Sequence, residues 1–342
     1  MNTLALLNVF LFAVLVATAL AITRIRALYA AAMLASLFSL VLASLFVMLD
    51  AVDVAFTEAA VGAGVSTVLF LSVLALTRSR EAVTPRRKRW PAGLVVLLTG
   101  GTLLFASQDL PPFGAPDTPV QQHPVTDVYL VDSTEQIGIP NTVTAVLASY
   151  RGYDTLGELV VIFTAGVAVL LLLTRLPHPQ DPAGAPESAA PARYPDRASV
   201  VLADYRVLRV VSKLLMPFIL LFACYVLFHG EYGPGGGFQA GMILAAGVIL
   251  FGLVFGLDVA RRVLPRPVLL VLIAAGVLLY AGVGVADLLL GGAFLDYDVL
   301  RPGSPQAGQQ LGILLVETGV GITVAAVMTA VFFSFAGRGV SR

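Results

Sequence analysis

Three glutamates lie within long apolar runs of the sequence. Glu58 stands in "DAVDVAFTEAAVGAG", Glu158 in "RGYDTLGELVVIF" and Glu317 in "QQLGILLVETGVGITV". A carboxylate near the middle of an apolar helix in a bilayer costs about 3 kcal/mol, so such groups often mark ion or proton pathways. We therefore predict that the three side chains bind a proton or a cation reversibly. The alternative also stands: each carboxylate is held by a hydroxyl of a neighbouring helix or by a cation of a partner subunit.

Other acidic side chains accompany two of these glutamates. Asp50 and Asp53 lie where the helix of Glu58 begins, and solvated helix caps are the simpler interpretation of such positions. Asp154 is one turn before Glu158 and shares its helix face, but Arg151 is close enough to form a structural ion pair with it. Asp53 and Asp154 are therefore secondary candidates for the ion path.

The stretch "FHGEYGPGGGFQAGMIL", Phe228 to Leu244, concentrates glycine between two apolar runs. It lacks the trailing Lys-Ser/Thr and the preceding strand of a phosphate-binding loop. Two interpretations remain: a tight turn between helices, or backbone groups that line an aqueous cavity beside His229, which titrates near neutral pH. The candidate loop residues are Pro234, Gly235, Gly236, Gly237 and Phe238.

The elements that hold these residues are predicted to be membrane helices. Apolar residues make up 58% of the chain and charged residues only 12%, about half the charged fraction of a soluble domain. The first apolar run has no basic residue before it, which favours a retained helix over a signal peptide. We expect an all-α integral membrane protein with about nine transmembrane helices. These are placed at 3–23, 27–49, 54–77, 91–107, 154–174, 210–229, 238–260, 267–289 and 309–336.

The distribution of basic residues predicts the orientation. With the N-terminus outside, all but two of the 21 Lys and Arg residues fall in cytoplasmic segments, as expected for membrane proteins. The exceptions are Arg151 and Arg301. The C-terminus is then cytoplasmic, and the helices of the three glutamates all run from outside to inside. At 1.5 Å per residue the glutamates lie roughly 7 to 12 Å below the outer surface.

The composition also predicts the organisation of the chain. A Pro/Ala-rich cytoplasmic linker separates five helices from four, and "NTVTAVLASY" is expected to form a short interfacial helix after a long outer loop. The basic run "TRSREAVTPRRKRW" is interpreted as a topology anchor rather than a nucleic-acid patch. The predicted parts are a three-helix module at 1–90, a two-helix module with the outer loop at 91–175, the linker at 176–204 and a four-helix domain at 205–342.

Several kinds of chemistry are disfavoured. The two lysines, Lys88 and Lys213, both fall on the inner side, so a proton channel of alternating Glu and Lys cannot be assembled from this chain alone. The three histidines are dispersed and Cys224 is the only cysteine, which argues against a hydrolase, a disulfide and a cysteine-rich metal site. No cofactor is expected. Asp258 and Asp287 lie near helix ends and are expected to be solvated.

Three motifs carry a resemblance to a known family. "HGEYGPGGGFQAGMILA" resembles the signature of the B subunit of the Mrp-type multisubunit Na⁺/H⁺ antiporters, a four-helix domain that 205–337 fits throughout. "FVMLDAVDVAFTEAAVGAGVSTVLFL" and "NTVTAVLASYRGYDTLGELVVIF" are similar to two modules at the carboxy-terminal end of the large A subunit. Related modules occur in membrane-bound, energy-converting hydrogenases. The resemblance covers the chain except the linker and the outer loop, and lacks the large antiporter-like core.

The resemblance implies a function and two site residues. Glu58 and Glu158 correspond to membrane glutamates that the family needs for ion exchange, whereas Glu317 and His229 rest on the residues alone. We therefore expect a subunit of a Na⁺/H⁺ antiporter complex, multi-pass in the bacterial cell membrane, with Na⁺ held transiently near Glu58 and Glu158. Its partners would be Na⁺, H⁺, membrane lipid and the other subunits, including a large channel subunit, with no nucleic acid. The alternatives are an assembly adaptor that carries no ions and the ion-translocating arm of a hydrogenase.

Overall fold

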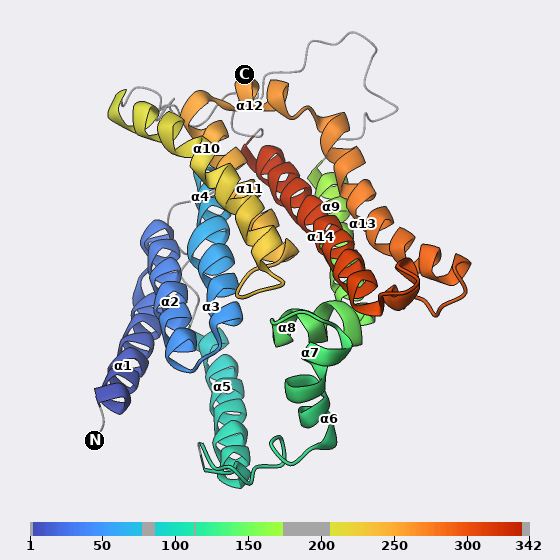
Figure 1. Cartoon of the computed structure of the whole chain (residues 1–342). Coiled ribbons are helices and arrows are strands. Elements are labelled where there is room, and N and C mark those ends of the chain that lie inside the picture. Colours follow the sequence, from blue (N-terminus) through green and yellow to red (C-terminus); the bar gives the residue numbers. More distant parts are fainter. Residues whose placement is uncertain (1–2, 77–85, 113, 174–205, 337–342) are drawn as a thin grey trace.

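The computed structural model (Figure 1) describes residues 3–76, 86–112, 114–173 and 206–336. Every regular element among them is a helix, and nine helices of this part of the chain are long and apolar enough to cross a membrane. The all-α membrane fold is thereby confirmed, while the orientation of the termini stays a prediction. The predicted linker, 176–204, lies outside the described residues. The nine spans are Thr3–Arg24, Leu28–Met48, Val52–Leu74, Trp90–Asp109, Gly152–Leu173, Arg209–His229, Gly237–Phe255, Arg266–Leu289 and Pro305–Ala336.

The first region is a three-helix unit. α1 (Thr3–Arg24) and α2 (Leu28–Met48) form a hairpin, and α2 packs against a third helix that carries Glu58. The sequence predicts this third helix as uninterrupted over 54–77. It is instead built of α3 (Val52–Glu58), the π-helical segment η1 (Ala59–Val65) and α4 (Ser66–Leu76).

The π-helical segment has a local cause and a local partner. Gly62 and Gly64 lie within it, and glycine stabilises a regular α-helix poorly. The hydroxyl of Ser36 on α2 donates a hydrogen bond to the carbonyl oxygen of Ala63 at 2.9 Å. A wide turn displaces carbonyls from their usual helical partners, and this bond satisfies one of them.

α5 (Arg86–Ala106) differs from the other spans in its position. It extends below the lower end of α3 in Figure 1 rather than lying beside it, and it ends in the short 3₁₀ turn η2 (Ser107–Asp109). None of the residues in its apolar window is buried. Its apolar surface is therefore available to lipid or to another subunit.

A cluster of short helices precedes α9 (Gly152–Leu173) on the lower side of the molecule in Figure 1. The expected short helix in "NTVTAVLASY" is confirmed, although it is a single α-turn followed by a π-helical segment. Asn141 caps it, because its side-chain oxygen accepts hydrogen bonds from the N–H groups of Val143 and Thr144. The cluster consists of α6 (Pro124–Asp127), η3 (Val128–Asp132), α7 (Ser133–Gln136), α8 (Thr142–Thr144) and η4 (Ala145–Tyr150).

The last region is built around α14, which lies between α11 and α13 and against α9 (Figure 1). Glycines permit this close packing: a Cβ atom on Gly241 of α11 would lie 2.7 Å from the carbonyl oxygen of Gly321. A Cβ on Gly319 would likewise lie 2.7 Å from the carbonyl oxygen of Gly276 on α13. The helices of this region are α10 (Arg206–His229), α11 (Gly237–Phe255), α12 (Leu257–Val263), α13 (Arg266–Leu289), the 3₁₀ turn η6 (Tyr297–Leu300) and α14 (Pro305–Ala336).

Two sequence-based expectations for this region are wrong. The helix predicted over 238–260 is broken at Gly256, whose φ of 97° ends α11 and directs the chain into α12. Asp287 is fully buried rather than solvated. The loop that follows α13 folds back over the end of the helix, and the N–H of Gly292 donates to the Asp287 carbonyl oxygen at 3.0 Å. Asp258 is exposed, as expected.

The last region packs against the earlier helices, which are the three-helix unit and α9. α9 contacts α13 and α14, α3 and η1 contact α11, and α4 contacts α14. The junction of the two regions is the place where these earlier helices meet the last region. A polar link crosses this junction, because the side-chain amide of Gln239 on α11 donates to the hydroxyl of Thr57 on α3 at 3.0 Å. The candidate site lies at this junction.

Candidate functional site

A cavity of about 350 Å³ lies between the two regions. Its acidic lining residues come from three different helices: Asp53 from α3, Glu158 from α9 and Glu317 from α14. α3, α9 and α14 run in the same direction in Figure 1, which brings the beginnings of α3 and α9 to one side of the molecule. The remaining polar side chains of the lining are Thr57, Thr144, Thr155, Gln239 and Tyr280.

Glu317 lies against the glycine turn. The N–H of Gly237 donates a hydrogen bond to its carboxylate. The two carboxylate oxygens are so close to the turn that Cβ atoms on Gly236 and Gly230 would lie 3.0 and 3.1 Å from them. The first N–H of α11, which has no partner within the helix, therefore donates to the Glu317 carboxyl group at the positive end of the helix dipole.

The glycine run is required by close backbone approaches. A Cβ atom on Gly235 would lie 2.5 Å from the carbonyl oxygen of Val226, and one on Gly237 would overlap the carbonyl oxygen of Glu317 itself. Gly236 has a φ of 117°, a backbone conformation that residues with a side chain rarely adopt. The turn is therefore both tight and part of the cavity wall, because Gly235, Gly237 and Phe238 line the cavity. The tight turn is therefore present and contributes to the cavity wall, whereas His229, the titratable group of the second interpretation, is not among the cavity-lining residues.

Asn141 fastens this turn to the cluster before α9. Its side-chain amide donates to the carbonyl oxygens of Gly230 and Gly233, both at 2.9 Å, and its oxygen caps α8. The hydroxyl of Thr144 also donates to the Gly230 carbonyl at 2.7 Å. Each bond contributes about 1 kcal/mol, so the set holds the turn against Glu317.

Glu231, in the same turn, adds a further acidic group. Its backbone carbonyl accepts a hydrogen bond from the N–H of Asn141 at 3.1 Å. Burial raises the pKa of its carboxyl above the ordinary glutamate value. Glu231 and Asp53 both interact electrostatically with Glu317.

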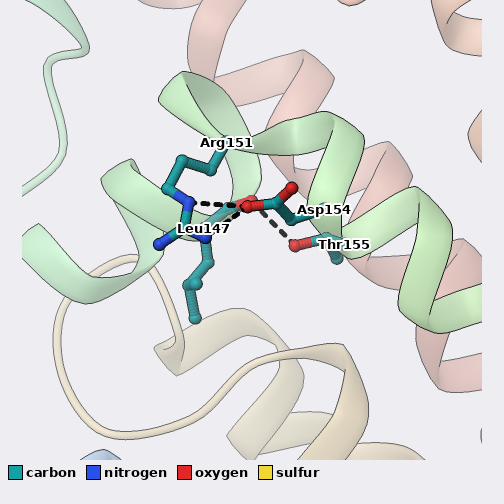
Figure 2. Close-up of polar contacts among 4 residues, drawn as sticks. All are labelled: Leu147, Arg151, Asp154 and Thr155. Carbon is teal, nitrogen blue, oxygen red and sulfur yellow. Dashed lines mark hydrogen bonds and ion pairs between the residues drawn. The ribbon is translucent and has the colours of Figure 1, made fainter.

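Glu158 is positioned by the turn that begins α9, shown in Figure 2. The Arg151 guanidinium pairs with Asp154 at 2.5 Å, and both side chains are about half exposed. The hydroxyl of Thr155 donates to the carbonyl oxygen of Leu147 at 2.8 Å and ties the first turn of α9 to η4. The expected Arg151–Asp154 pair is therefore present, and Asp154 is absent from the cavity lining whereas Glu158 belongs to it.

Glu58 does not line this cavity. Its side chain folds over Gly62, where an added Cβ would lie 2.7 Å from Oε1 of Glu58 and would also meet Oγ of Ser39 on α2. Glu58 therefore faces the α2 side of its helix, while its neighbour Thr57 faces the cavity. Two of the three predicted glutamates, Glu158 and Glu317, therefore line the same cavity. Glu58 does not line it, although the preceding residue in the sequence, Thr57, does.

The remaining candidates lie around the turn. The His229 ring stacks on Tyr225, with centroids 4.9 Å apart, and its Nε2 would lie 3.0 Å from a Cβ on Gly233. Pro234 is exposed. Neither residue lines the cavity. Within the described part of the chain, no three His, Cys, Asp or Glu side chains are grouped so that they could hold a metal ion.

Sequence reasoning missed several polar cavity residues. Gln239 and Tyr280 are uncharged residues within apolar helices, so they do not stand out in the sequence. Only the tertiary structure shows that they face the cavity. Asn141 had a detectable signal, since an asparagine before Thr-Val-Thr is a typical helix N-cap. That signal predicts the cap but not the bonds to a turn some 90 residues later in the chain.

Three family models match the chain in succession. Residues 13–79 match the MbhD subunit of MBH, 116–190 match the MbhE subunit of MBH, and 207–330 match a domain related to the MnhB subunit of Na⁺/H⁺ antiporters. The cavity thus lies where segments of all three matches meet.

Similar proteins include antiporter subunits. A protein of Rhizobium meliloti (strain 1021), named as the A/B subunit of a probable K(+)/H(+) antiporter, is 27% identical over 280 residues, which cover 77% of this chain and 27% of that protein. The B subunit of the Na(+)/H(+) antiporter of Bacillus subtilis (strain 168) is 32% identical over 127 residues, which cover 34% of this chain and 88% of that protein.

A solved structure extends the comparison. A chain of the Mrp complex from Dietzia sp. DQ12-45-1b superposes with a TM-score of 0.75 at 28% identity, over 97% of this chain and 35% of that chain. This chain therefore spans about a quarter to a third of the length of the Rhizobium and Dietzia chains and nearly all of the Bacillus protein. It is a multi-pass membrane protein that belongs to the family of MnhB-related subunits of Na⁺/H⁺ antiporters, and MBH-type segments precede its MnhB-related domain.

Proposed function

We propose that this chain is a membrane subunit of an Mrp-type Na⁺/H⁺ antiporter complex and that its cavity is part of the cation and proton path. One observation carries the proposal: a cavity at the junction of the two regions is lined by Glu158 and Glu317 from different helices. Similar proteins are named antiporter subunits, which supports a role in transport rather than in an enzymatic reaction.

The cavity is suited to ions that compete for a carboxylate. Its volume corresponds to roughly ten water molecules, enough for a partly hydrated cation. Carboxylate, hydroxyl and carbonyl oxygens can replace part of the water shell of a hard cation, and the same carboxylates can hold a proton. A carboxyl that has taken up a proton no longer attracts the cation, so the two ions bind one at a time. Antiport requires such alternative binding of the two ions to one site.

The charge of the site favours cations. Among the described residues that line the cavity, none is Lys, Arg or His. Asp53 lies in the lining, and Glu231 acts on Glu317 from the turn. A cavity of one charge sign with apolar walls concentrates counter-ions, so the wall attracts Na⁺ and H⁺ to Glu158 and Glu317.

We expect the 342-residue chain to be inactive by itself and to work beside a larger antiporter-like protein. Relatives that include this segment are about three times as long. The apolar surfaces of α1, α2 and α5 are largely exposed and suit contact with lipid and other subunits. Vesicles that contain this chain alone should show no Na⁺ flux driven by a pH gradient, and robust flux would contradict this expectation.

The test uses the complete complex in vesicles with an internal pH dye. Added Na⁺ should collapse an imposed pH gradient with the wild type. Glu158→Gln, which keeps the shape and fixes the site as neutral, should slow this collapse about tenfold or more. The matched control is Glu135→Gln, an exposed acid outside the cavity. If Glu158→Gln and Glu317→Gln complexes both assembled and exchanged ions at wild-type rates, the chain would be an assembly adaptor.

The names of similar proteins differ in the cation that is exchanged for H⁺. The Rhizobium relative is named for K⁺ and the Bacillus relative for Na⁺. The same assay with K⁺ in place of Na⁺ measures the preference, and we expect Na⁺ to be the better substrate because the MnhB-related part matches Na⁺/H⁺ antiporters. Purification of redox subunits with the complex would instead identify the arm of a hydrogenase-type assembly.

A further inference from the structure

The hydroxyl groups that line the cavity have one feature in common. Four of the described lining residues carry a hydroxyl, and each hydroxyl donates its single proton to a backbone carbonyl oxygen. The pairs are Thr57 with Asp53 at 3.0 Å, Thr144 with Gly230 at 2.7 Å, Thr155 with Leu147 at 2.8 Å and Tyr280 with Gly152 at 2.9 Å. A hydroxyl whose proton is engaged in this way can offer only its lone pairs to another group. The hydroxyls of the cavity are therefore fixed as acceptors.

The Thr57 hydroxyl also fixes the orientation of the Gln239 amide. Its proton is engaged with the Asp53 carbonyl, so its oxygen can only accept a hydrogen bond from Gln239. The part of the amide that faces Thr57 is accordingly the NH₂ group, which donates at 3.0 Å. The amide oxygen, Oε1, then points away from Thr57, on a side chain that lines the cavity. Gln239 thus adds one more neutral oxygen whose direction is set by Thr57.

These neutral oxygens lie next to the carboxylates. Thr155, drawn in Figure 2, is three residues before Glu158 on α9, and both residues line the cavity. Residues at this spacing share a helix face, with Cβ atoms about 5–6 Å apart. Gln239 lies in the first turn of α11, two residues after Gly237, whose N–H donates to the Glu317 carboxyl group. The cavity therefore combines carboxylates, which can take up a proton, with hydroxyl and amide oxygens, which do not at neutral pH.

We propose that Thr155 and Gln239 are neutral oxygen ligands for a partly dehydrated Na⁺ held at Glu158, and that Thr57 is the residue that orients Gln239. The inference rests on the proposed function and deepens it, because it assigns different determinants to the two exchanged ions. A proton needs only a carboxylate oxygen. A cation that loses part of its water shell must regain those contacts from protein oxygens, and hydroxyls fixed as acceptors supply them without turning a proton toward the cation.

The two alkali cations should depend on these oxygens to different degrees. Na⁺ is smaller than K⁺ and holds its water more tightly, so it gains more from each protein oxygen that replaces a water molecule. Removal of one neutral oxygen should therefore weaken the binding of Na⁺ more than that of K⁺, and should leave proton uptake by the carboxylates unchanged. A purely structural role of the same residues would affect both cations equally.

The experiment measures the initial rate of exchange by the complete complex in vesicles over a series of Na⁺ or K⁺ concentrations. Gln239→Met keeps the length of the side chain and removes its oxygen, and should raise the half-saturating Na⁺ concentration about tenfold. Thr155→Val should act in the same direction, and Thr155→Ser should regain most of the lost affinity. The half-saturating K⁺ concentration should rise less, and the pH profile at saturating Na⁺ should keep its wild-type shape.

Two matched controls carry the same substitutions outside the cavity. Gln122→Met changes an exposed residue, and Thr164→Val changes an exposed threonine of α9 that donates to a carbonyl of its own helix. Neither residue lines the cavity. Both variants should show the wild-type dependence on Na⁺ concentration.

The remaining outcomes separate this inference from the proposed function. Wild-type half-saturation by Na⁺ in Gln239→Met and Thr155→Val, while Glu158→Gln is inactive, would overturn the ligand assignment and leave the cavity path intact. A lower maximal rate with equal effects on Na⁺ and K⁺ would also overturn it, because the residues would then support only the structure. Wild-type exchange by these variants and by both Glu158→Gln and Glu317→Gln would remove the assignment together with the proposed path. The two substitutions lie on different helices, so if one prevents assembly the other still decides.

Discussion

Glu317 and Glu58 show two ways to keep a carboxylate in a membrane helix. Glu317 is surrounded by backbone: the turn before α11 wraps it, and the N–H of Gly237 donates to it. Glu58 lies beside a π-helical segment, with the Ser39 side chain of α2 as its neighbour. Backbone is fixed by the fold, whereas a side chain can rotate. The comparison suggests a rigid site at Glu317 and an adjustable one at Glu58.

The helices around Glu317 are also more buried than the helices around Glu58. In the apolar window of α14, 56% of the residues are buried, compared with 11% in α1 and α2. The α14 region therefore forms its own core, and the α1–α2 region depends on lipid or other subunits to cover it. Substitutions that add volume should distinguish the two regions most clearly.

The largest effect is expected for Gly237→Ala. The new methyl group would overlap the Glu317 carbonyl oxygen, and such overpacking between two backbones costs about 3 kcal/mol. The complex should lose thermal stability or fail to assemble, as measured by size-exclusion chromatography. The matched variant is Gly64→Ala, whose methyl would lie at an ordinary 3.6 Å from the nearest atom. Equal yields of the two variants would contradict the difference in rigidity.

The next effect concerns the clamp on the turn. Asn141→Ala removes four hydrogen bonds, two donated and two accepted, and should lower the stability of the complex by about 2 kcal/mol. Thermal unfolding monitored by intrinsic fluorescence measures the change. Thr102→Ala is the control, because Thr102 is exposed and bonds only within its own helix. A shift no larger than that of the control would show that the turn keeps its place without Asn141.

Glu58→Gln addresses transport at the adjustable site. We expect slower Na⁺/H⁺ exchange with normal assembly, and a smaller loss than Glu158→Gln causes, because Glu58 does not line the cavity. Glu58→Asp should retain part of the activity with a shifted pH optimum. The pH-dye assay in vesicles ranks the three variants. A greater loss in Glu58→Gln than in Glu158→Gln would move the main path to the α2 side of the helix.

The smallest effect on stability is expected for Ser36→Ala. This change removes the single hydrogen bond to the Ala63 carbonyl, which contributes about 1 kcal/mol. Ser44→Ala is the control, since Ser44 bonds only to its own helix. If the bond holds the π-helical segment, Ser36→Ala should also shift the pH profile of exchange through Glu58. A profile identical to that of the control would separate the segment from transport.

Glu231 predicts a pH dependence of stability. Burial raises the pKa of its carboxyl above the ordinary value of 4.5, so the protonated form is favoured in the folded protein. The associated stability is fully present below the unfolded-state pKa and is lost as the pH rises through the folded-state pKa. Glu231→Gln should remove this part of the pH dependence in thermal unfolding. An unchanged slope would show that other groups determine it.

The sequence predicts much of this fold and part of the site. Hydropathy identifies the nine spans because nearly every apolar run is long enough to be unambiguous, and the three glutamates stand out against them. The break at Gly256, the π-helical segment and the burial of Asp287 could not be predicted, because each depends on what packs against the helix. For the same reason the sequence could not show which side of its helix faces the cavity. Thr57 lines the cavity and the predicted site residue Glu58 does not.

The central claim is that the cavity between the two regions conducts the ions, and a cysteine placed in its wall tests this most directly. In a Cys224→Ser background, Thr57→Cys should react with a cationic methanethiosulfonate reagent. The reaction should stop exchange and should be slower in the presence of Na⁺. Gln122→Cys, exposed outside the cavity, should react without loss of exchange. Complete modification of Thr57→Cys with exchange unchanged, or no reaction at all, would contradict the account.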